Sequence, residues 1–259
     1  MRFLGSARSG RRYVFAKDTS GGIDGYIEVV RNGNGANIHA HLNVTGLDVV
    51  QLHKFDANCE GEAVAYKWHI HTLWHQDQSS AFLAGCSLAI AGNHYDPDFA
   101  CGPNSEYNKD ARCQNVSYVC NPTMYASNPL ACERGDLSGK LGDMQVVNGI
   151  IEQSWWDPHY PAVDEERPEW NMLLHAVCSN KATPRVACAI AAPIDSDVAV
   201  DATVAPWVLV GVLLASLLLL YQMRHPLLFK HYPTNVVVAA VIAVLGLLLY
   251  QYVVIDSAL

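Results

Sequence analysis

Apolar and polar residues alternate with a period of two along several short stretches of residues 1–204. Turn sequences rich in Gly, Asn, Asp and Pro, such as DTSGG and RNGNG, separate these stretches, a pattern typical of antiparallel strands. A helical period of 3.6 is missing before Ala205. The pattern therefore predicts an all-β Greek-key sandwich or barrel. The predicted strands are Tyr13–Ala16, Ile23–Arg31, Ala36–Thr45, Ala63–His71, Asn171–Val177 and Arg185–Ala192.

The stretch from Tyr95 to about Glu169 lacks this alternation and is predicted to be a long loop. A loop of that length is unusual in a compact domain unless it is functional or cross-linked. Four of the eight cysteines lie within it, so we expect disulfides to hold it. The β domain is then expected to span residues 13–192, with a short acidic linker at 193–204.

Two uninterrupted apolar segments follow the linker. Ala205–Met223 has no charged residue over 19 positions, and Asn235–Ile255 has none over 21. About 20 apolar helical residues cross the hydrocarbon core of a bilayer, so both segments are predicted to be transmembrane helices that form an α-helical hairpin. The connector at 224–234 carries Arg224 and Lys230, and by the positive-inside rule it faces the cytoplasm or an equivalent matrix. The β domain would then lie on the opposite side of the membrane.

The cysteines also indicate that the β domain lies on the side of the membrane opposite the cytoplasm or matrix. The eight cysteines form no CxxC pair, which favours disulfides in an oxidising compartment over thiolate metal sites. Glycosylation sequons begin at Asn43 and Asn115, whereas residues 1–12 are rich in arginine, as in a mitochondrial presequence. Both a cell-surface location and the mitochondrial inner membrane facing the intermembrane space remain open.

The formal charge is −8 overall, and residues 205–259 contribute only Arg224, Lys230 and Asp256, so residues 1–204 carry −9. An acidic domain of this kind argues against nucleic acid as a partner. The two apolar segments make the lipid bilayer an expected partner.

A His-x-His pair, His69 and His71, ends one predicted strand. Residues i and i+2 of a strand face the same side, so both imidazoles can converge on one metal ion. Four further motifs follow this pair along the chain. They are, in order, Gly92-Asn93-His94-Tyr95-Asp96-Pro97, Cys132 to Lys140 (CERGDLSGK), Leu173-Leu174-His175, and Pro184 to Ala189 (PRVACA). The order and flanks of these motifs, from about Tyr13 to Ala192, resemble the copper/zinc superoxide dismutase family.

The resemblance implies a superoxide dismutase-like fold and a role for each matching residue. His69, His71, His94 and His175 match the copper ligands, and Arg185 matches the arginine that guides and holds the superoxide anion. Cys86 and Cys188 match the family's intramolecular disulfide. The pairing of Cys59, Cys101, Cys113, Cys120, Cys132 and Cys178 stays open, because six cysteines allow 15 connectivities.

Departures from the two-metal pattern resemble the copper-only members of the family. No histidine lies between His94 and His159, and Glu133 stands where the last zinc histidine is expected, so copper without zinc is the expected cofactor. The outward nitrogen of His94 then needs a protein partner, and Glu133 and Asp136 are the candidates. We expect Asp136→Ala to loosen copper more than Glu133→Ala.

The resemblance implies a membrane-anchored enzyme that converts superoxide to oxygen and hydrogen peroxide, with Arg185, His94, Glu133 and Asp136 in its catalytic machinery. Two alternatives stay open: a copper-holding protein without turnover, and an accessory or structural subunit of a membrane complex, respiratory complexes included. His39 and His41 also alternate on a predicted strand, but the sequence shows no third ligand beside them.

Overall fold

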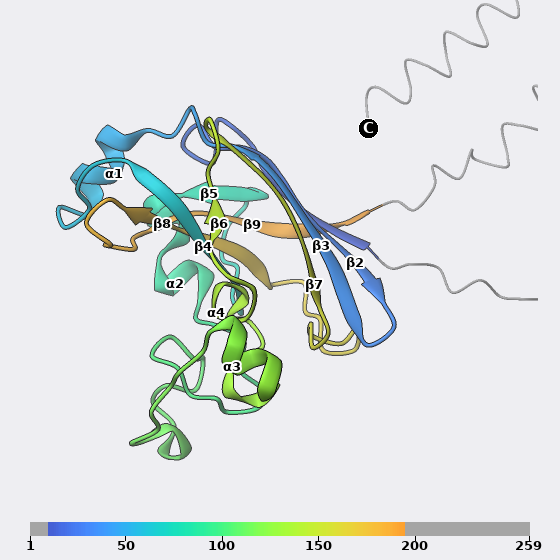
Figure 1. Ribbon diagram of the computed structural model, residues 1–259. Helices are drawn as coiled ribbons and strands as arrows, with labels where there is room; N and C mark the ends of the chain where they lie inside the picture. The colour runs from blue at the N-terminus through green and yellow to red at the C-terminus, as the bar shows by residue number, and fades with distance from the viewer. Residues whose placement is uncertain (1–9, 195–259) are drawn as a thin grey trace, which may run out of the picture. The chain divides into compact units, whose positions relative to one another are not determined.

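The computed structural model describes residues 10–194, which form a domain of antiparallel strands with short helices (Figure 1). Within that range the first strand begins at Gly10, so Arg11 and Arg12 belong to the sheet and not to a preceding segment. The strands are β1 (Gly10–Phe15), β2 (Asp24–Asn32), β3 (Gly35–Asn43), β4 (Ala63–His71), β5 (Ser80–Phe82), β6 (Met144–Gln145), β7 (Ile150–Asp157), β8 (Asn171–Cys178) and β9 (Arg185–Ile194).

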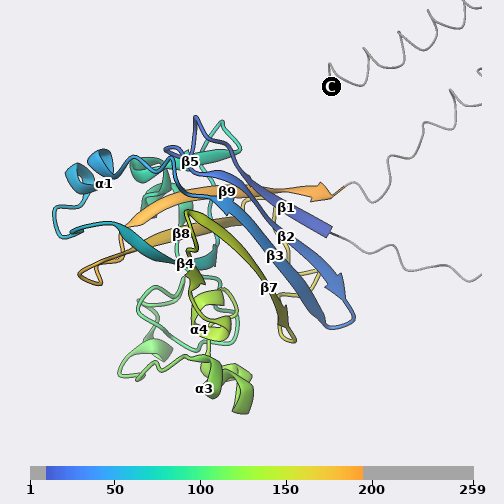
Figure 2. The same ribbon diagram turned by 45° about the horizontal axis from the view of Figure 1, so that its top comes forward.

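These strands pair in the order β6-β4-β8-β9-β1-β2-β3-β7, and β5 adds to β9. The long strand β9 joins the two halves, because its first part pairs with β8 and its last part pairs with β1. The connections from β3 to β4 and from β7 to β8 both cross between the halves, as in Greek-key proteins (Figure 2). The outermost strands β6 and β7 meet where the Gln145 amide donates to Gln153 Oε1 at 2.6 Å, which nearly closes the sheet into a barrel.

The interior of this barrel is filled from both halves. On β3, Ile38, Ala40 and Leu42 are fully buried, whereas the alternate residues point outward, as the period of two requires. Trp68 on β4 contacts Trp155 on β7 with ring centroids 4.6 Å apart, so the core side chains of the two halves interdigitate.

Strand β7 was missed by the sequence pattern, and the prediction of an unbroken loop from Tyr95 to Glu169 is wrong over this stretch. The strand pairs along its whole length with β3. Its alternation is hidden because the amide side chain of Gln153 takes an inward position near the end of the barrel, while Trp156 points outward and is 47% exposed.

Short helices also precede Ala205, where none was predicted. They are α1 (Val49–Phe55), α2 (Leu88–Ala91), α3 (Pro122–Ser127) and α4 (Leu137–Leu141). Segments this short cannot show a helical stripe in the sequence, and α1, α3 and α4 each begin at a capping side chain. Asp48, Asn121 and Asp136 each accept a hydrogen bond from a backbone amide three residues later.

Four disulfides join all eight cysteines. Cys86 pairs with Cys188, as the resemblance implied, and the others are Cys59–Cys178, Cys101–Cys113 and Cys120–Cys132. Two of these bonds close loops within the segment between α2 and α4, which carries little regular structure. None of the helices within residues 10–194 is long and apolar enough to cross a membrane. The predicted transmembrane segments at 205–223 and 235–255 lie outside the described residues.

Candidate metal centre

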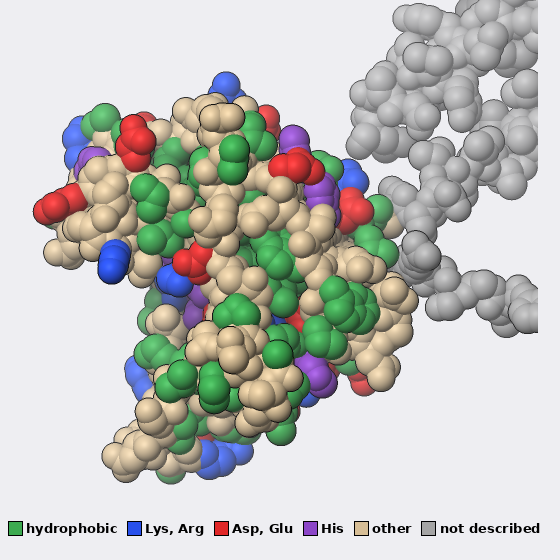
Figure 3. Space-filling model, in the orientation of Figure 1, with side chains coloured by type: hydrophobic (Ala, Val, Ile, Leu, Met, Phe, Trp, Pro, Cys, Tyr) green, Lys and Arg blue, Asp and Glu red, His purple; other side chains and the backbone are tan. Residues whose placement is uncertain are grey.

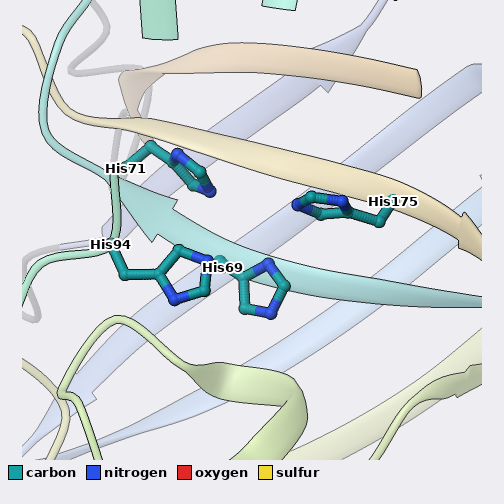
Figure 4. Close-up of side chains that lie close together, drawn as sticks. All are labelled: His69, His71, His94 and His175. Carbon is teal, nitrogen blue, oxygen red and sulfur yellow. The ribbon is translucent and has the colours of Figure 1, made fainter. Parts of the chain in front are cut away.

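Four histidines that are far apart in the sequence meet at one side of the barrel (Figure 4). His69 and His71 come from the end of β4, His175 from β8, and His94 from the segment after α2. One ring nitrogen of each lies within 4.8 Å of the others, and all four side chains are buried. His94 is held in place by bridges to His71 on one side and to Ser105 on the other.

Each ring has one nitrogen without any hydrogen-bond partner. Buried polar atoms in native proteins are almost always bonded, so four orphans at one point call for a ligand that accepts four lone pairs. A metal ion is such a ligand, and imidazole nitrogen is a preferred donor for transition metals. The orphan atoms are His69 Nδ1, His71 Nε2, His94 Nε2 and His175 Nε2.

In His71, His94 and His175 the opposite nitrogen is hydrogen-bonded to the protein, which fixes the ring's orientation. His71 Nδ1 donates to the Gly92 carbonyl at 2.9 Å, and His175 Nδ1 donates to the Thr183 carbonyl at 2.9 Å. These two acceptors are backbone atoms, so no residue type in the sequence marks them.

Burial favours the neutral form of His69, His71 and His175. It lowers the pKa of His69 to about 4 and holds the pKa values of His71 and His175 well below the ordinary range, with the neighbouring histidines adding to the effect. Neutral imidazole is the form that binds metal, so these three rings are in the right state at neutral pH without losing protons first.

Glu133 is the partner of His94. Its carboxylate oxygen Oε2 accepts from His94 Nδ1 at 2.5 Å, and the side chain is 1% exposed. Burial raises the pKa of Glu133, while the hydrogen bond from His94 opposes that shift. Gly102 makes room for this carboxylate, because a Cβ there would lie 2.2 Å from Glu133 Oε1.

Asp136 makes other contacts and does not bond the outward nitrogen of His94, so we now expect the larger effect on copper from Glu133. The Asp136 carboxylate caps α4 by accepting from the Gly139 amide at 2.8 Å, and it accepts from the Tyr118 hydroxyl at 2.7 Å. It reaches a ring ligand only at His69, whose Nε2 lies 3.4 Å away. Burial raises the pKa of Asp136, but the contacts with His69 and Tyr118 outweigh it and leave that pKa below its usual value. Nothing in the sequence pattern singled out Tyr118, which stands alone in an irregular loop.

Arg185 lies beside the ligands, at the start of β9. Its Nη1 donates to the Gly92 carbonyl at 2.9 Å and to the Cys86 carbonyl at 3.3 Å. The Gly92 carbonyl therefore accepts from both Arg185 and His71, and the Cys86–Cys188 disulfide ties the second acceptor to β9. This network holds a guanidinium next to the histidine cluster.

A pocket of about 230 Å³ opens onto the cluster and gives small molecules access to it. Its lining includes three of the histidines, His69, His94 and His175, together with Tyr118, Glu133 and Asp136. Lys67, which pairs with Asp143 at 2.9 Å, lies among the lining residues.

Comparisons with known proteins find little sequence similarity. No protein-family model matches the chain. No curated protein matches it either. Among solved structures, a single-residue mutant of Candida albicans superoxide dismutase 5 aligns with 72% of this chain and 90% of its own, at 14% identity and a TM-score of 0.43. A likeness this distant identifies neither the metal nor the reaction, which have to be inferred from the site itself.

Proposed function

We propose that this protein is a copper-dependent superoxide dismutase that holds one copper ion with no zinc site beside it. The observation that carries the proposal is the set of four buried, unpartnered imidazole nitrogens within 4.8 Å of one another. Four neutral nitrogen donors suit Cu(II) and also tolerate Cu(I). Copper bound there would supply a redox couple that accepts an electron from one superoxide and returns it to a second.

The role of Arg185 is to bind the anion. Its guanidinium shares the Gly92 carbonyl with His71, so its positive charge is held beside the ligand cluster. The chain outside the two apolar segments carries a strong negative charge, which repels superoxide from most of the surface. The fixed guanidinium of Arg185 counteracts that repulsion next to the histidine cluster.

The role of Glu133 is to orient His94 and to hold a proton at its Nδ1. The hydrogen bond of 2.5 Å between His94 Nδ1 and Glu133 Oε2 supports this assignment. Glu133 Oε1 is buried without a partner, which leaves the carboxylate a second atom that can accept a proton. Formation of hydrogen peroxide from superoxide consumes two protons, so a carboxylate in contact with a ligand ring is suitably placed to relay them.

The same hydrogen bond argues against zinc at this place. In a two-metal site the second nitrogen of the bridging ring faces the second ion, whereas here the His94 Nδ1 faces Glu133. The proposal therefore assigns this carboxylate the orienting task that a zinc ion performs elsewhere.

We also propose that the apolar segments at 205–223 and 235–255 anchor the domain on the non-cytoplasmic side of a membrane. The charge-free length of the segments and the basic connector support this placement. Disulfides formed by all eight cysteines agree with an oxidising compartment.

The test is superoxide consumption by the copper-loaded full chain, measured by stopped flow together with copper content. We expect turnover in the wild type and a loss of about tenfold or more in Arg185→Ala, with copper retained, because the side chain acts on the anion. Arg112→Ala is the matched control, since that arginine is exposed and contacts Asp110 and the Phe99 ring rather than the histidine cluster. A copper-loaded chain that consumes no superoxide would instead be a copper-holding protein, and the proposal would be wrong.

A further inference from the structure

A second group of metal-binding side chains lies on the outer face of the sheet, away from the barrel interior. His39 and His41 both point outward from β3, with side chains 38% and 48% exposed. Figure 3 shows histidine side chains next to acidic ones on this surface, over the half of the sheet that contains β1, β2 and β3. The sequence had shown no third ligand for this pair.

The strand that the sequence pattern missed, β7, supplies the third ligand. Its register with β3 places Glu152 directly opposite His41, and Ser154 opposite His39. The Glu152 carboxylate contacts both rings: Oε1 lies 3.2 Å from His39 Nε2, and Oε2 is hydrogen-bonded to His41 Nδ1. Two imidazoles therefore contact one carboxylate, each through a different oxygen.

Neighbouring side chains orient these ligands. His39 Nδ1 is hydrogen-bonded to the Ser154 hydroxyl at 3.1 Å, which turns the Nε2 of that ring toward Glu152. The Tyr26 ring lies against both imidazoles, with centroid distances of 6.0 Å to His39 and 5.9 Å to His41. The hydrogen bond with His41 lowers the pKa of Glu152, so its carboxylate is ionised at neutral pH.

The surrounding charges favour a cation. Glu28 on β2 is the cross-strand neighbour of His39. The nearby cation is Arg12, which pairs with Glu28 at 2.6 Å and stacks over Tyr26 at 4.7 Å from the ring centroid. Its charge is therefore largely balanced, and the negative charge of the domain attracts metal ions to this surface.

We propose that His39, His41 and Glu152 bind a divalent transition metal ion such as Zn²⁺. Ligand atoms at about 2.0–2.2 Å from a tetrahedral zinc ion lie roughly 3.3–3.6 Å from each other. The separation of 3.2 Å between His39 Nε2 and Glu152 Oε1 is close to this value. The two rings and the carboxylate have to turn so that one oxygen and both nitrogens face the same ion, and all three side chains are exposed enough to do so. Solvent completes the coordination.

Such an ion would clip β3 to β7, which is the last strand in the pairing order. Metal that binds only the folded state also stabilises it, so the edge of the sheet becomes more resistant to opening when the ion is present.

The experiment measures Zn²⁺ bound to the full chain by equilibrium dialysis, with variants at both histidine groups. In the copper-free protein, zinc can occupy the four-histidine group as well as the surface group. The wild type is therefore expected to bind two zinc ions, His41→Asn one, His175→Asn one, and the double variant none. Glu152→Gln should weaken the surface site by at least about tenfold, because even the loss of an outer-shell partner costs 10–100-fold. His159→Asn, which replaces an exposed histidine on the segment after β7, is the matched control and should still bind two.

Carbethoxylation followed by mass spectrometry provides an independent readout at the residues themselves. Zn²⁺ should protect His39 and His41 from modification in the wild type and should fail to protect His39 in Glu152→Gln. A stoichiometry that His41→Asn leaves unchanged, or modification of His39 and His41 at the same rate with and without Zn²⁺, would overturn the proposal.

Discussion

Replacement of Glu133 tests how the metal site keeps its fourth ring in place. Glu133→Gln keeps the shape of the side chain but removes its charge, and Glu133→Ala removes the acceptor altogether. In both variants His94 loses the charged partner that accepts from its Nδ1 at 2.5 Å. Because the residue is 1% exposed, water cannot simply take the place of the carboxylate.

The size of the effect follows from that burial. A hydrogen bond to a charged group contributes about 1.5–3 kcal/mol, and each 1.4 kcal/mol is a factor of ten in affinity. Copper should therefore bind about 10- to 150-fold more weakly in Glu133→Ala, in line with the 10–100-fold cost usual for outer partners of metal ligands. In Glu133→Gln the weakening of copper binding should be near the lower end of this range, because the amide oxygen can still accept from His94.

The assay is competition for copper with a chelator of known affinity, combined with superoxide consumption at saturating copper. Asp136→Asn is the comparison variant, because it can still cap α4 and its contact with His69 is long, at 3.4 Å. We expect Asp136→Asn to lose less copper affinity than Glu133→Ala. Asp136→Ala should act mainly on stability, by about 0.5–2 kcal/mol, through loss of the cap.

Unchanged copper affinity and turnover in both Glu133 variants would show that something else orients His94. A larger loss in Asp136→Asn than in Glu133→Ala would restore the order expected from the sequence and would refute the assignment made from the structure.

Three further outcomes are expected. After dialysis against a chelator strong enough to strip exposed sites, elemental analysis should find about one copper and no stoichiometric zinc per chain, and a retained equivalent of zinc would contradict the copper-only site. Lys140 is paired with the fully buried Asp157 at 2.6 Å. Lys140→Met should lower the free energy of unfolding, measured in urea, by about 3–5 kcal/mol, because it leaves that carboxylate without its counter-charge. Lys54→Met, at an exposed position, should change the free energy of unfolding little. Protease added to the connector side of sealed membranes should cut near Arg224–Lys230 at most, and digestion of residues 10–194 from that side would overturn the proposed topology.

Several features of the molecule could be predicted from local pattern. The boundaries of β4 match the predicted Ala63–His71 because polar and apolar residues alternate from Tyr66 to His71 and the flanking turns are clear. The four histidines could be named in advance because their flanking motifs are short and contiguous, and the structure brings the same four together. Both kinds of feature depend on residues close to one another along the chain.

The tertiary structure decided what depends on residues that are distant in sequence. Glu133 and His94 are 39 positions apart, and only the path of the intervening loop brings that carboxylate, and not Asp136, to the ring. Likewise, Cys59 and Cys178 are 119 positions apart, and no spacing rule selects that pair among the open connectivities. The contact between Glu152 and the two outward histidines of β3 depends on the register between β3 and β7. Strand register and loop closure are set by how the whole core packs, so local periodicity carries no record of them.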